Sequence, residues 1–127
     1  MNGYKHFGEF SDATLALETT IQDNPAYNIK WKITLIFYAA LHSIQDYLVK
    51  TDNTHYPWNN FCSLMDHSHR RQIIQNNSNL SPIYSKYCAL YSLSITARYC
   101  PHVPQTTQDL LEAKKLLAAI KQQIRIP

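Results

Sequence analysis

The scarcity of glycine limits what this chain can fold into. Its 127 residues include two glycines, Gly3 and Gly8, and both precede the first long apolar pattern. A strand-rich domain needs tight turns at positive φ, which glycine mostly supplies. A glycine-rich phosphate loop of the P-loop or Rossmann type is excluded for the same reason. The chain is therefore predicted to be all-α.

Hydrophobic periodicity predicts four long helices and one short helix. Apolar residues recur at spacings of three and four in each long segment, which is the pattern of a helix with one buried face. Ser11 or Asp12 is the expected N-cap of the first helix, Asp66 that of the short helix, and Ser81 that of the helix beginning at Pro82. The expected helices span residues 11 or 12 to 23, 26–50, 66–75, 82–99, and 106 or 107 to 125.

Length and composition favour one domain, residues 1–127, folded as an up-down bundle of four to five helices. No apolar run approaches the roughly 18 residues of a membrane span, so no membrane contact is expected. The first residues lack the pattern of a secretory signal, which predicts a cytoplasmic protein. There Cys62, Cys88 and Cys100 would stay reduced, and their spacing suggests neither a disulfide framework nor a zinc site.

Charge is divided unevenly along the chain. Residues 1–62 carry four lysines against six carboxylates, whereas residues 63–127 carry eight basic residues against three acidic ones. The C-terminal half is therefore where an anionic partner would bind, although a solvated basic face is the common alternative.

Three segments together resemble the small HEPN domains of prokaryotes. The segment WKITLIFYAALHSIQDYL, residues 31–48, is similar to the aromatic-rich second helix of that family. HSHRRQII, residues 67–74, looks like its short helix with a histidine and arginines, and IYSKYCALYSLSITARY, residues 83–99, looks like its third long helix. The order and spacing of the three segments match together over just over half of the chain.

This resemblance implies a helical bundle that often dimerises. It also implies a metal-independent endoribonuclease in toxin–antitoxin, abortive-infection or CRISPR-linked antiviral defence, and no cofactor. The family signature is an arginine followed after four to six residues by a histidine. Its nearest match here is Arg98 and His102, with three residues between them.

The chemistry of metal-free RNA cleavage suits this pair. Such cleavage needs a base for the 2′-hydroxyl proton, an acid for the leaving 5′-oxygen and positive charge for the phosphorane. Histidine titrates near neutral pH, and arginine offers a planar fork to phosphate. We therefore predict Arg98 and His102 as catalytic residues, with Tyr99 as an RNA contact. The alternative is that Arg98 is a cation at a helix end.

A second constellation comprises His67, His69, Arg70 and Arg71. On a helix, His67 shares a face with Arg70 or Arg71, a geometry that suits a phosphate. These four residues are predicted to bind phosphate or RNA, and the alternative is a solvated helix start. No metal site is expected, because a two-residue histidine spacing without further ligands is unfamiliar for zinc.

Tyr38 and His42 lie four residues apart on the longest predicted helix. They are expected to orient the arginine of the third long helix, or else to satisfy their own polar atoms at the bundle edge. A stripe of tyrosines at positions 84, 87 and 91 is expected to be core or dimer interface.

Two classes of function follow. The first is an RNA-binding or RNA-cleaving homodimer. The second is a non-catalytic dimerisation module that docks a protein partner, such as an antitoxin encoded nearby, or a nucleotide-binding subunit.

Overall fold

The computed structural model describes residues 7–21, 27–51 and 66–124. Within this part the chain is helical and contains no strand, which confirms the all-α prediction. The elements are α1 (Phe7–Thr19), α2 (Tyr27–Thr51), α3 (His67–Asn76), the 3₁₀ turn η3 (Ser81–Ile83), α4 (Tyr84–Tyr99) and α5 (Thr107–Gln123).

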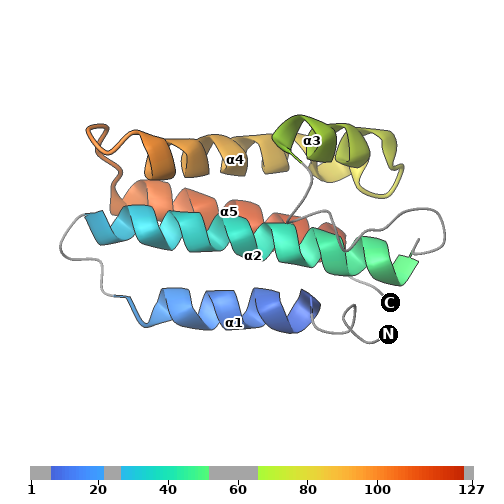
Figure 1. Ribbon diagram of the computed structural model, residues 1–127, viewed down its shortest axis with the longest axis horizontal. Coiled ribbons are helices and arrows are strands. Elements are labelled where there is room, and N and C mark those ends of the chain that lie inside the picture. Colours follow the sequence, from blue (N-terminus) through green and yellow to red (C-terminus); the bar gives the residue numbers. More distant parts are fainter. Residues whose placement is uncertain (1–6, 22–26, 52–65, 125–127) are drawn as a thin grey trace.

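The helices form a bundle around α2. Figure 1 shows α1 along one side of α2, with α4 and α5 on the opposite side and α3 over the start of α4. The successive long helices α1, α2, α4 and α5 run in alternating directions, as expected of an up-down bundle.

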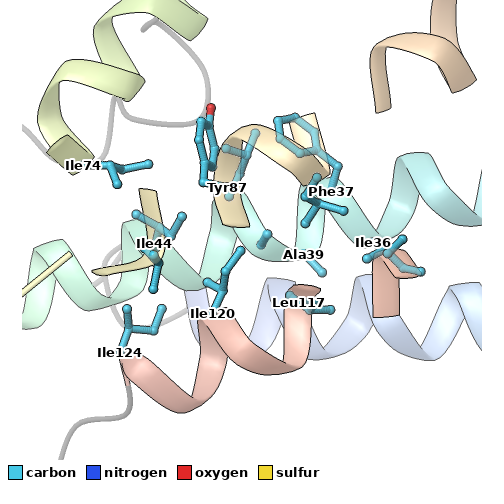
Figure 2. Close-up of a cluster of buried hydrophobic side chains, with 14 of the residues drawn as sticks. Ile36, Phe37, Ala39, Ile44, Ile74, Tyr87, Leu117, Ile120 and Ile124 are labelled. Atoms are coloured by element: carbon cyan, nitrogen blue, oxygen red, sulfur yellow. The ribbon is translucent and has the colours of Figure 1, made fainter. Parts of the chain in front are cut away.

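The hydrophobic core gathers on α2 because this helix has packing partners on opposite sides. Ile33, Ile36, Leu41, Ile44 and Leu48 have no exposed surface. In Figure 2 the α2 side chains meet side chains from three other helices, namely Ile74 of α3, Tyr87 of α4, and Leu117 and Ile120 of α5. Each fully buried side chain of this size contributes about 1.5–3 kcal/mol, so α2 dominates the stability of the bundle.

The predicted start of the first helix is wrong. Helix α1 begins at Phe7, so Ser11 and Asp12 lie inside it rather than at its N-cap. The Ser11 hydroxyl donates to the Ala39 carbonyl at 3.0 Å and lies 2.8 Å from Ser43 Oγ. The Ser11 hydroxyl therefore bonds to α2 instead of capping α1. The helix ends at Thr19, and the expected end at Asp23 lies outside the described residues.

The predicted cap at Asp66 is confirmed, and the last helix begins where the sequence predicted, with a cap that was not predicted. Asp66 Oδ1 accepts the His69 N–H at 2.8 Å and starts α3. Thr106 and Asp109 form a reciprocal capping box that starts α5, in which Asp109 Oδ2 accepts the Thr106 N–H at 2.8 Å. Each cap joins residues three positions apart in the sequence, so the local pattern of residue types could indicate where the helix begins.

The cap predicted at Ser81 is wrong. Ser81 and Pro82 belong to the 3₁₀ turn, and α4 begins two residues later at Tyr84. Asn77 organises the preceding turn, because its Oδ1 accepts the N–H groups of Asn79 and Leu80 at 2.9 and 3.1 Å. The tight turn fixes the entry into α4 instead of a serine cap.

A buried ion pair ties α1 to α2. Lys32 Nζ lies 3.2 Å from Glu18 Oε2, and their side chains are only 8% and 3% exposed. Lys32 also donates to the Ile21 carbonyl at 2.8 Å, and Lys114 of α5 approaches the same carboxylate oxygen at 3.6 Å. These contacts compensate the cost of removing the two charges from water.

None of the described helices has the length and apolar character needed to cross a membrane.

Glu18→Gln is expected to lower the free energy of unfolding by about 3 kcal/mol, because it leaves the Lys32 ammonium buried without its carboxylate. Urea denaturation followed by circular dichroism measures this change. The matched control is Lys50→Met, which breaks the more exposed pair with Asp46, 3.0 Å apart, and should cost less than about 1 kcal/mol. Equal losses in the two variants would show that the Glu18 pair does not hold α1.

Candidate functional site

The junction of α4 and α5 is held by a lysine from α2. Lys30 Nζ donates to the carbonyls of Val103, Cys100 and Thr96, at 2.6, 3.1 and 3.4 Å, and to Gln105 Oε1 at 3.2 Å. The last carbonyls of a helix lack partners within the helix and carry partial negative charge. The Thr96 and Cys100 carbonyls also accept the N–H groups of Cys100 and Val103, so the ammonium adds charge-assisted bonds that fix the chain after α4.

Gln105 completes this junction from inside. It is buried, and its Nε2 donates to the Leu93 carbonyl at 3.1 Å while its Oε1 accepts from Lys30. Sequence reasoning assigned no role to Lys30 or Gln105. Their contacts span up to 75 residues in the chain, and no local pattern signals them.

Arg98 lies in the last turn of α4, facing α2. Its Nε and Nη2 donate to the Ser94 carbonyl and hydroxyl at 3.3 and 3.2 Å. Its guanidinium carbon lies 5.5, 5.8 and 5.2 Å from the ring centroids of Phe37, Tyr38 and Tyr99. The group thus lies among three aromatic rings, an arrangement that cation–π attraction stabilises. Its bond to the Ser94 carbonyl also fits the alternative role of a cation at a helix end.

Arg98 borders a hollow between α2 and α4 with a volume of about 460 Å³. We call this the Trp31 hollow; it is lined by Tyr27, Lys30, Trp31, Thr34, Tyr38, Ala97, Arg98 and Pro101. The lining contains two basic side chains, Lys30 and Arg98, and no carboxylate, so its charge favours an anion.

His102 is exposed and borders a second hollow of about 320 Å³, which we call the His102 hollow. It is lined by Tyr27, Lys30, Pro101, His102, Pro104 and Gln105. Three residues, Tyr27, Lys30 and Pro101, line both hollows. The structure therefore brings Arg98 and His102 to the same end of the bundle, on adjoining hollows.

The other residues predicted near Arg98 are placed as follows. Tyr38 lines the Trp31 hollow and contacts the guanidinium, while Tyr99 contacts it from α4 and is 67% exposed. His42 lies one helical turn beyond Tyr38 and is half-buried, and desolvation lowers the pKa of its imidazole. Of the predicted pair on α2, the tyrosine thus contacts Arg98.

His67, the first residue of α3, packs against aromatic rings of α4. Its ring stacks on Tyr91 with centroids 3.3 Å apart and planes 3° from parallel, and its Nδ1 lies 3.2 Å from the Tyr87 hydroxyl. The ring centroid of Phe37 lies 6.0 Å from that of Tyr87 and 5.7 Å from that of Tyr91. Tyr87 is buried, and this burial raises its pKa to about 12. Arg70 hydrogen-bonds the Tyr87 side chain as well.

This placement separates the four residues of the second constellation. His67 faces α4 and is engaged by protein, whereas His69 and Arg71 are exposed on α3. Desolvation is the main cause that lowers the pKa of His67, and the positive charges of Arg71 and Arg70 lower it further. The neutral imidazole is therefore the form that anchors α3 to α4.

Within the three described ranges, no group of three or more His, Cys, Asp or Glu side chains is placed to hold a metal ion. Comparisons with protein-family models, with curated proteins and with solved structures gave no match.

Removing the Lys30 ammonium should destabilise the α4–α5 junction. Lys30→Met is expected to reduce the free energy of unfolding by about 2 kcal/mol, since hydrogen bonds to charged groups contribute about 1.5–3 kcal/mol. Chemical denaturation measures the loss, and amide hydrogen exchange should quicken at Cys100 and Val103. Lys115→Met, an exposed lysine of α5, is the control. Unchanged exchange at the junction would contradict the assigned role.

The stability of the bundle should fall as the pH drops below the usual histidine pKa of 6.5. Because the folded-state pKa of His67 is lowered, the unfolded state takes up the proton first, and acid favours unfolding. His67→Phe keeps a ring against Tyr91 but cannot titrate. Unfolding free energies at about pH 7.5 and about pH 5.5 should differ less in this variant than in the wild type. Equal differences would show that His67 does not contribute.

Proposed function

We propose that this chain is a HEPN-like domain that binds RNA and cleaves it without a metal at the α4–α5 junction. The single observation that supports this most is the placement of Arg98 and His102 on adjoining hollows with shared walls. The nearest match in this sequence to the arginine–histidine signature of HEPN domains is the same pair, with three residues between them where the signature has four to six.

In the proposed reaction, the 2′-hydroxyl of one nucleotide attacks the adjacent phosphorus, and the bond to the 5′-oxygen of the next nucleotide breaks. The imidazole of His102 transfers a proton to or from these oxygens, the role that histidine most often has in general acid–base catalysis. Arg98 bonds to the charged phosphorane oxygens. Within the described residues its own hydrogen bonds use Nε and Nη2, so Nη1 can donate to phosphate.

A homodimer completes the proposal. One histidine supplies one of the two proton transfers, so a second group is needed for the other. A two-fold axis beside the junction would place a second His102 at the same phosphate.

The alternative is a non-catalytic HEPN-like interaction module. The exposed rings favour it, because Tyr27 and Trp31 are each 63% exposed and Tyr99, which contacts Arg98, is 67% exposed. Exposed aromatic groups of this kind often form protein interfaces. In that case the chain would dimerise or dock a partner such as an antitoxin, and it would turn over no RNA.

The purified protein is expected to cleave RNA in EDTA, and Arg98→Ala and His102→Ala should each reduce the rate by at least about a hundredfold, the usual scale for a proton-transfer or charge-stabilising group. Gel analysis of labelled RNA measures the cleavage. Arg98→Lys should restore little activity, because an ammonium lacks the planar fork.

Lys115→Ala is the matched control, since it removes an exposed positive charge of α5 outside both hollows. Cleavage that persists in both site variants would refute the assigned residues. Wild-type protein that cleaves no RNA and instead co-purifies with a stable partner would favour the interaction module.

A further inference from the structure

Three aromatic rings stand exposed in line on α2, although this helix is the most deeply buried element of the bundle. Tyr27, Trp31 and Tyr38 are separated by four and seven residues, so they project from one face of the helix. Their exposed fractions are 63%, 63% and 38%. All three line the Trp31 hollow, so the exposed rings form the wall of a concavity.

The opposite wall carries the positive charge. Arg98 of α4 lies with its guanidinium carbon 5.8 Å from the Tyr38 ring. The guanidinium is thus held beside an aromatic wall, with donors left for a ligand. An apolar partner side chain would leave these donors without acceptors, at a cost of about 1–3 kcal/mol if they were covered. A ligand with both a flat ring and an anionic group can stack on the aromatic rings of α2 and accept hydrogen bonds from Arg98 of α4.

The size of the hollow admits one nucleotide. Its volume of about 460 Å³ lies within the range of about 300–1,000 Å³ that is typical of small-molecule sites. Unpaired bases stack on aromatic side chains and on arginine planes, whereas a base inside a duplex is not accessible to them. The site therefore discriminates against paired strands.

We propose that the Trp31 hollow binds one unpaired nucleotide, with its base against Trp31 and Tyr38 and its phosphate at Arg98. This inference rests on the proposed function and specifies its substrate as single-stranded RNA. The nucleotide in the hollow positions the strand so that the next phosphodiester lies towards His102, on the adjoining hollow.

Binding is tested with a labelled single-stranded RNA hexamer carrying 2′-O-methyl groups, which block attack by the 2′-oxygen and separate binding from cleavage. Fluorescence anisotropy of the full chain should show that Trp31→Ala weakens binding about tenfold, the scale of one base–aromatic stack. Trp31→Phe should retain most of the affinity. The same hexamer paired with its complement should bind at least about tenfold more weakly.

Leu111→Ala is the control, because this α5 side chain is 51% exposed and borders neither hollow. Circular dichroism establishes that each variant is folded. Equal affinity of Trp31→Ala and wild type, or equal affinity for single strand and duplex, would overturn the nucleotide site while leaving cleavage by Arg98 and His102 intact.

One further comparison distinguishes failure of the nucleotide site from failure of the ribonuclease. Binding of the methylated hexamer that depends on Trp31, with no cleavage of unmodified RNA, would support the nucleotide site and refute the ribonuclease. Failure of the wild type to bind the hexamer, together with a dimer that Trp31→Ala dissociates in light scattering, would overturn the site. The exposed rings would then be covered by a second copy of the chain.

Discussion

Helix α2 packs against other helices on opposite sides. The arrangement of the bundle depends on which partners its buried side chains meet, the charged ones included. Its apolar residues supply most of the core, but it also carries two lysines one turn from its start. Each lysine has a different partner. Lys32 forms an ion pair with Glu18 of α1, and Lys30 donates hydrogen bonds to the backbone carbonyls that follow α4. Two cations on one helix thereby fix elements on opposite sides of it.

Elements defined by local patterns could be predicted from the sequence. The bounds of α2 and α3 agree with the periodicity within one residue, Asp66 caps α3 as expected, and α5 begins at the predicted position. The error at Ser11 arose because a distant contact competes with a local preference. Ser11 has the chemistry of a cap, but its hydroxyl bonds to Ala39, 28 residues away. A single sequence does not reveal which neighbour will claim such a group.

The candidate site shows the same division. Arg98 and His102 could be proposed from the sequence because they are the nearest match to a short motif. The walls around them could not, because Tyr27 and Trp31 read as ordinary residues of an amphipathic helix until α4 is placed against them. The tyrosine stripe of α4 divides similarly: Tyr87 is core, while Tyr91 is half-buried and receives the ring of His67. Which tyrosine meets which element is decided by helix rotation, and periodicity leaves that rotation undetermined.

The attachment of α1 has a consequence for the order in which the bundle opens. Helix α1 packs on α2 and reaches α5 through the long side chains of Lys114 and Lys121. Helices α2, α4 and α5 contact one another directly. Loss of α1 would therefore break its contacts with α2 and leave the contacts among α2, α4 and α5 in place. The surface of α2 uncovered in this way would include the Ala39 carbonyl, which accepts the Ser11 hydroxyl in the folded bundle.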